Sequence, residues 1–326
     1  MRALTLLVVL AGVAPAPLPA QERRDEQFYY PGSFNWQFLR HYPEAGRLFN
    51  AFDYGHAILY ELLYSGAATE PGRLEAREFD YLTRDLLVRP PRFAAAEEAV
   101  APRYSRMAWR AKQMFDRAHV LHRQIYDVYA DERLTDAARI ALVERLVDYY
   151  LMDRKAAFVD VPKDMALMDE QYFSQVFRQR YPRFNGLIWA YHWLQVGLYE
   201  PLITGRTREE KQAGVRVALA TFWRMLDSPP ANLPSVMPMA SAVAPEFSKR
   251  HPRAAIIFDN LHMMHDIISD ILASERVAPA GKRAAIDAAL DEFQNATRNV
   301  MEMEHWWMMA EHMGGVEKMG GVAPGG

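Results

Sequence analysis

The sequence predicts an all-α fold, a large bundle of about ten helices with a polar site in its helix-lined interior. Several long stretches open with Pro or close with Gly, which are the signals of helix ends. Strand-like alternation of apolar and polar residues is nearly absent. Half of the 326 residues are hydrophobic, enough for a large core, yet histidines and acids recur inside the apolar stretches.

The composition narrows the classes of partner and cofactor. The net charge is −3 and no basic block occurs, so we expect no nucleic-acid partner. Cysteine is absent, which excludes disulfides, thiolate metal sites and iron–sulfur clusters. Any metal must therefore be bound by histidine, carboxylate or methionine.

The first 20 residues are predicted to be a signal peptide. Met1-Arg2 gives a short positive start, residues 3–14 are apolar, and small residues and Pro lead to Ala20. The apolar run is too short to span a membrane, and no later segment offers 18 clean apolar residues. We expect a mature chain that is periplasmic or secreted and has no membrane span.

Residues 21–42 are predicted to form an aromatic, extended arm that packs on the body, and residues 43–313 an all-helical metal-binding domain. Pro43 suits the first turn of a helix that closes before Gly66. Thr135 and Thr207 are expected helix caps. In this half of the domain, helices are predicted at 43–65, 73–88, 102–130, 136–152, 163–180, 182 to about 200, and 208–226.

The second half of the domain is predicted to begin with a loop. Residues 228–245 are rich in Pro, Ala, Ser and Met, with a weak helical turn possible at 239–243. Pro252 opens the next helix, and a last helix is expected from about 280 to 313. The Gly-rich tail, 314–326, is predicted to be disordered.

The most informative pattern is an acid three residues before a histidine. Four of the ten histidines have one, whereas chance would give about one. Residues three apart lie on one face of a helix, so both side chains could bind one ion, or the acid could orient the imidazole. The four pairs are Asp53 and His56, Asp116 and His119, Asp259 and His262, and Glu302 and His305.

Three more histidines are candidate ligands: His122, His192 and His265. The helices that begin at Pro182 and Pro252 each have a histidine ten residues on and an acid eight residues after that. The helix at 102–130 has the same order of His119, His122 and an acid. These later acids, Asp127, Glu200 and Asp270, are either part of a second metal layer, outer partners of ligands, or solvated charges.

The acid-x-x-His pattern resembles the Glu-x-x-His motif of ferritin-like di-iron bundles. The resemblance covers only the motif, and three of the four acids here are Asp rather than Glu. It implies a polynuclear non-haem iron site between helices. The alternative is that hydrogen-bonded acid–histidine pairs only hold helices together.

Two other segments resemble known families over short lengths. Residues 260–266, Asn-Leu-His-Met-Met-His-Asp, are similar to a segment of the secreted all-α zinc nucleases and zinc phospholipases C. That resemblance implies a zinc-dependent phosphodiesterase. Residues 55–64 are similar to the Gly-x-His-x-x-Glu helix of imelysin-like exported helical proteins, with the Glu displaced by two residues.

The last predicted helix has a stripe of soft ligands, formed by Met301, His305, Met308 and His312. One interpretation is a Met-rich core stripe. The other is a copper site, because thioether and imidazole ligands suit copper.

Three classes of function follow from these patterns. The first is an exported oxidoreductase with a His/carboxylate site; the second is a zinc hydrolase; the third is a non-catalytic carrier of iron or copper. Non-haem iron is the expected ion, with zinc, manganese or copper as alternatives, and a small molecule is the expected substrate if the protein is an enzyme. His41 and His251, both at predicted helix starts, are expected to be dispensable.

Overall fold

The computed structural model describes residues 36–66, 70–94, 96–314 and 318–320, and the predicted all-α fold is confirmed for them. Of the described residues, 72% are helical and none forms a strand. A single isolated bridge pairs Lys163 with Val300. None of the helices in these ranges combines the length and apolar character that crossing a bilayer requires.

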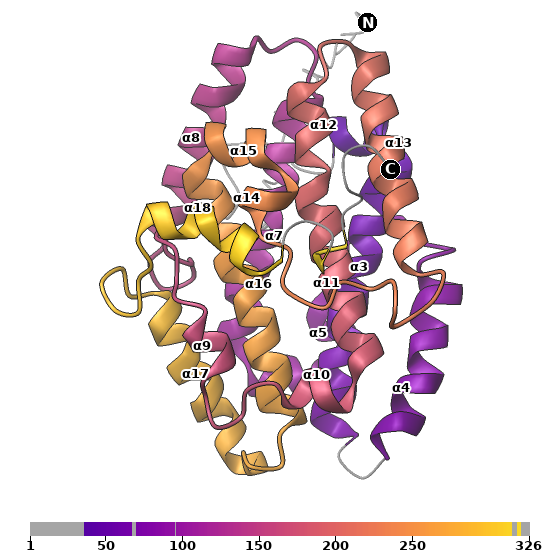
Figure 1. Ribbon diagram of the computed structural model, residues 1–326, viewed down its shortest axis with the longest axis vertical. Helices are drawn as coiled ribbons and strands as arrows, with labels where there is room; N and C mark the ends of the chain where they lie inside the picture. The colour runs from indigo at the N-terminus through magenta and orange to yellow at the C-terminus, as the bar shows by residue number, and fades with distance from the viewer. Residues whose placement is uncertain (1–35, 67–69, 95, 315–317, 321–326) are drawn as a thin grey trace, which may run out of the picture.

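Four long helices form the centre of the bundle (Figure 1). They are α3 (Pro43–Ser65), α7 (Trp109–Ala130), α11 (Pro182–Gly197) and α16 (Pro252–Ala273). Helix α16 contacts both α3 and α7, and α11 contacts α3. Every residue of α16 from Ala254 to Ala273 is buried, so this helix is covered on all sides.

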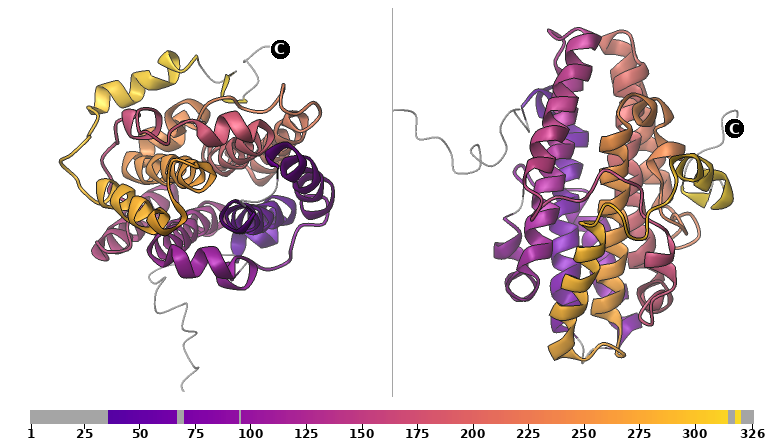
Figure 2. Two further views of the ribbon diagram at one scale, coloured as in Figure 1. Left: turned by 90° about the horizontal axis from the view of Figure 1, so that it is seen from below. Right: turned by 90° about the vertical axis from the view of Figure 1, so that its left-hand side faces the viewer.

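The remaining longer helices surround this centre (Figure 2). α8 packs on α7, α13 on α11, α17 on α16 and α4 on α11. Their bounds are α4 (Pro71–Asp80), α8 (Asp136–Met152), α13 (Arg208–Met225) and α17 (Lys282–Phe293). The predicted caps are present, because the hydroxyl of Thr135 accepts from Ala138 and Thr207 forms a capping box with Glu210.

A short helix and a one-residue joint precede each central helix, so the chain contains four copies of one unit. The short helices are α2 (Gln37–His41), α6 (Pro102–Met107), α10 (Val176–Arg180) and α15 (Pro245–Arg250). The joint residues are Tyr42, Ala108, Tyr181 and His251. The repeat predicted for the helices that begin at residues 102, 182 and 252 therefore also includes α3. The helix predicted at 102–130 is divided at Ala108 into α6 and α7.

The acids at the far end of each unit have a structural role. Each lies eighteen residues after the first residue of its central helix and accepts backbone N–H groups at the start of another unit's short helix. The carboxylate of Asp270, for example, accepts from the amides of Gln175 and Phe177, both at 2.7 Å. Glu61 accepts in the same way from α6, Asp127 from residues 36 and 38 at α2, and Glu200 from α15.

This capping is reciprocal within pairs of units. The first unit caps the second and the second caps the first, and the third and fourth units are paired in the same way. The later acids are therefore helix caps, and the interpretations that made them a second metal layer or solvated charges are wrong.

Several predicted helices differ in length from those observed. The helix predicted at 73–88 is α4 followed by the π-helix η1 (Tyr81–Leu86), and 163–180 is irregular except for α9 (Ala166–Asp169) and α10. Short elements also occur where loops or single helices were expected. They are α5 (Glu97–Val100), α12 (Tyr199–Thr204) and η2 (Pro279–Gly281), whereas α14 (Ala240–Val243) confirms the helical turn predicted at 239–243.

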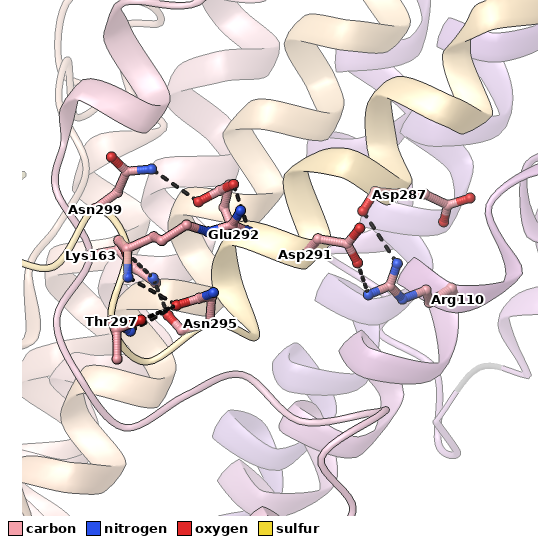
Figure 3. A network of polar contacts seen from close by, with 9 residues as sticks. Arg110, Lys163, Asp287, Asp291, Glu292, Asn295, Thr297 and Asn299 are labelled. Atoms are coloured by element: carbon pink, nitrogen blue, oxygen red, sulfur yellow. Dashed lines mark hydrogen bonds and ion pairs between the residues drawn. The ribbon is translucent and has the colours of Figure 1, made fainter.

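The single helix predicted for 280–313 is wrong, because residues 294–302 form a loop between α17 and α18 (Met303–His312). Lys163 supplies the reason (Figure 3): its ammonium donates to the carbonyls of Asn295 and Arg298 at 2.5 and 2.6 Å. Asn299 closes the loop with φ +48°, a conformation that Asn tolerates. These contacts break the helix, and α18 lies on the outside of the bundle (Figure 2).

The ends of the domain also differ from expectation. Residues 37–41 are helical rather than extended, although they pack on the body as predicted: Phe38 stacks on Tyr126 at 4.6 Å. In the tail, Met319 is buried, so the predicted disorder does not apply to residues 318–320. Residues 1–35, which include the predicted signal peptide at 1–20 and most of the predicted arm at 21–42, lie outside the described residues, as do 315–317 and 321–326 of the tail.

Candidate metal centre

The four units place their polar side chains at the same two positions of the central helices. The tenth residue after each helix start is Asp53, His119, His192 or His262. The thirteenth is His56, His122, Gln195 or His265. Positions three apart share one face of a helix, so each central helix presents two polar groups to the interior. The six imidazoles are at most 9% exposed.

Four of these imidazoles, one from each central helix, form the middle of the cluster: His56, His119, His192 and His265. The ring of His265 lies 4.4 Å from His56, 4.7 Å from His192 and 5.5 Å from His119. Within this set, His56, His119 and His265 each offer one ring nitrogen, and these three atoms lie within 4.8 Å of one another. Small side-chain adjustments would let the three bind one ion.

The array continues beyond this trio. His262 stacks on His192, with ring centroids 4.0 Å apart, and His122 lies 6.1 Å from His262. His122 is oriented by the hydroxyl of Tyr199, which is 2.8 Å from its Nδ1 atom. The structure thus brings together six of the seven histidines that the sequence nominated as ligands.

Burial keeps these imidazoles neutral. Desolvation, with the neighbouring His119 as the next cause, lowers the pKa of His56 to about 3. Desolvation and then Arg123 lower the pKa of His119 to about 3. The pKa values of His122, His192, His262 and His265 lie well below the ordinary range, mainly through desolvation. Neutral imidazole is the form that binds a metal.

The ring nitrogens need a partner that the rest of the described chain does not supply. Neither nitrogen of His56, His192, His262 or His265 is hydrogen-bonded to a described residue. The Nε2 atoms of His119 and His122 also have no hydrogen-bond partner among the described residues. A buried polar group without a partner costs about 1–3 kcal/mol, and a bound ion would compensate several of them at once. The residues present therefore fit a metal.

Only one of the four predicted acids lies beside the imidazole cluster. Asp53 is 3.6 Å from the Nδ1 atom of His119 and forms an ion pair with Arg123. Asp116 instead pairs with Lys112 at 2.7 Å. The site is therefore rich in imidazole and poor in carboxylate, unlike the di-iron motif.

Asp259 faces away from the cluster. Its two oxygens accept from the backbone N–H of Ala240 and from the indole N–H of Trp306, both at 2.9 Å. Asp259 thus connects α16 to α14 and α18, and not to His262. This differs from both interpretations, in which the acid either acts with its histidine at a metal site or is hydrogen-bonded to that histidine.

Glu302 and His305 do not belong to this interior, and the prediction that His305 joins the other imidazoles is wrong. Both are exposed at α18, where the ring of His305 lies 5.9 Å from that of His312. The loop at 294–302 turns α18 out of the bundle, so the acid-x-x-His spacing is present without a facing helix.

The two expected negative controls differ from each other. His251 is fully buried, and its Nε2 atom lies 2.6 Å from the hydroxyl of Tyr129. The expectation that His251 is dispensable overlooked this packing. His41 is half-buried and lies 3.4 Å from Glu132, away from the cluster.

Two residues that shape the site, Arg123 and Asn50, were not predicted from the sequence. Arg123 donates to Asn50 at 2.8 Å and pairs with Asp53, which holds that carboxylate beside His119. The Tyr191 ring lies 5.7 Å from that of His56, and a side chain at Gly55 would meet it at 2.9 Å. In the sequence, only the fourfold repeat could have indicated these neighbours, because it shows which faces of the four central helices meet in the interior.

No family of proteins, curated protein or solved structure matches the chain. The short resemblances to di-iron bundles, zinc nucleases and imelysin-like proteins therefore stay predictions.

Proposed function

We propose that the protein is an exported metalloprotein whose buried imidazoles hold a redox-active ion. The single observation that carries the proposal is that His56, His119 and His265 offer three nitrogens within 4.8 Å of one another. They come from three different helices, and each is neutral and deeply buried. The export is proposed from the signal-peptide pattern of residues 1–20.

The donor set favours iron or copper as the ion. Imidazole suits zinc, copper, iron and nickel, whereas manganese prefers oxygen ligands, and Asp53 is the only described carboxylate paired with an imidazole of the cluster. His192 is the next ligand in reach of the trio, and His262 and His122 extend the array toward a second ion, which supports a polynuclear centre. Buried tyrosines, among them Tyr60 and Tyr191, surround these rings and suit oxidoreductase chemistry.

A zinc hydrolase is the second candidate, because three histidines also form catalytic zinc sites. Such a site keeps a position open to water and substrate. The imidazoles here are 0–9% exposed, which favours an enclosed redox or storage centre over hydrolysis of a phosphodiester.

The test is metal analysis of the chain purified from its own compartment and washed with a chelator that strips exposed sites. Single His56→Ala, His119→Ala and His265→Ala variants should each lose most of the metal, because each removes one of three ligands. His41→Ala is the matched control and should keep it. The proposal falls if the wild type carries no metal, or if all three variants stay fully loaded.

An absorption spectrum of the loaded protein then separates the candidates. After oxidation in air, Fe(III) or Cu(II) would give a coloured protein, whereas zinc would give a colourless one. Turnover with oxygen or a phosphodiester would distinguish an enzyme from a carrier.

A further inference from the structure

We infer that α18 carries a separate, exposed copper site formed by His305, Met308 and His312. The site does not depend on the buried centre, since its ligands lie on a different helix and face solvent. It uses the part of the last predicted helix that the loop at 294–302 moves to the outside of the bundle.

Helix geometry places the three side chains on one stripe. Positions 305, 308 and 312 are separated by three and four residues, which is one turn in each case. The imidazoles of His305 and His312 are two turns apart along the helix, yet their ring centroids are only 5.9 Å apart and nearly perpendicular. Met308 lies between them and is 44% exposed. Two imidazoles and a thioether can therefore approach one ion.

The docking of α18 keeps this stripe accessible. Trp306 is 1% exposed and anchors the helix by donating its indole N–H to Asp259. Trp306 is the neighbour of His305 in sequence and lies about 100° around the helix from it, so the anchored face and the stripe point in different directions. His305 and His312 are both exposed as a result.

The ligand types select copper. Thioether sulfur is a soft ligand that favours Cu(I), and imidazole also binds copper well, whereas zinc, magnesium and calcium do not seek thioethers. Met309, half-buried and one turn after His305, offers a second thioether on the same side. Because no cysteine is present, methionine is the one soft ligand in the chain.

The site can be tested with Cu(I) under anaerobic conditions in competition with a coloured Cu(I) chelator, using the full mature chain. The wild type should withdraw copper from the chelator. Met308→Leu should weaken binding at α18 about tenfold or more, and a His305→Ala/His312→Ala double variant should abolish it. Met303→Leu is the matched control. It removes a thioether that is 41% exposed on the same helix but lies about 160° away from His305, and it should change nothing.

A second variant separates this site from the buried one. His56→Ala/His265→Ala removes two buried ligands and should leave binding at α18 intact, even if the buried centre also takes copper. Equal affinity in the wild type, Met308→Leu and the double histidine variant would overturn the inference, as would preference for Zn²⁺ over Cu(I). Circular dichroism of each variant confirms that the bundle is still folded.

Discussion

Two stretches of the chain have the same acid-x-x-His spacing and opposite surroundings. On α16, His262 is fully buried and stacks on His192, while Asp259 accepts two buried hydrogen bonds. At α18, Glu302 and His305 are both exposed. The spacing fixes which face of a helix the pair occupies, but neighbouring helices decide whether that face meets other ligands or water.

The two stretches are also in contact, through Trp306 and Asp259. The acid of the buried pair is thus the anchor of the helix that carries the exposed pair. This link explains why Asp259 turns away from His262, and it makes the contrast testable by substitution.

The largest expected effect comes from Asp259→Ala. It leaves the N–H of Ala240 and the indole N–H of Trp306 without an acceptor in a buried place, at about 1–3 kcal/mol each. The free energy of unfolding, measured with urea, should fall by about 2–4 kcal/mol. Trp306→Phe removes only one of the two donors, so its loss should be smaller. A change below about 0.5 kcal/mol for Asp259→Ala would mean that α18 is not anchored here.

A second contrast concerns His251, the joint residue of the fourth unit. The first and third units have a tyrosine at this position, Tyr42 and Tyr181, and the second has Ala108. Desolvation and then Arg250 lower the pKa of His251 to about 4, and Tyr129 bonds its Nε2 atom. Glu144 lies 3.7 Å from the other ring nitrogen. Between pH 6.5 and pH 4 the unfolded chain binds a proton that the folded chain excludes, so acid destabilises the fold.

His251→Tyr should therefore flatten the pH dependence of stability. The free energy of unfolding of the variant relative to the wild type should rise by about 2 kcal/mol between pH 7.5 and pH 5. The comparison is made by urea denaturation across that range. Any cost of the larger side chain shifts both ends equally and leaves the slope unchanged. Parallel curves would show that the pKa of His251 is the same in the folded and unfolded chains.

The sequence could predict much of the central bundle because its signals are local. Pro43 and Pro252 start helices as expected, and His56, His119 and His262 meet in one interior. Spacing along a helix is enough to place residues on a common face, and an apolar context is enough to predict burial.

The parts that failed depend on contacts between distant segments. The loop that interrupts the helix predicted at 280–313 is held by Lys163, more than 130 residues earlier in the chain. The acid Asp270 caps α10, about 95 residues away, so its role could not be read from α16 alone. His305 was misplaced for the same reason: the spacing is local, but the partners are not.

The smallest expected effect is at the exposed pair. With copper removed by a chelator, a Glu302→Gln/His305→Gln variant should change the free energy of unfolding by less than about 0.5 kcal/mol, because both side chains are exposed and neither is a buried contact. His305 touches His312, which is itself exposed, so the lost ring contact is replaced by water. The measurement is urea denaturation beside Asp259→Ala, the substitution at the acid of the matching buried pair. A loss comparable to that of Asp259→Ala would show that α18 is packed through this face, and the distinction between the two stretches would no longer hold.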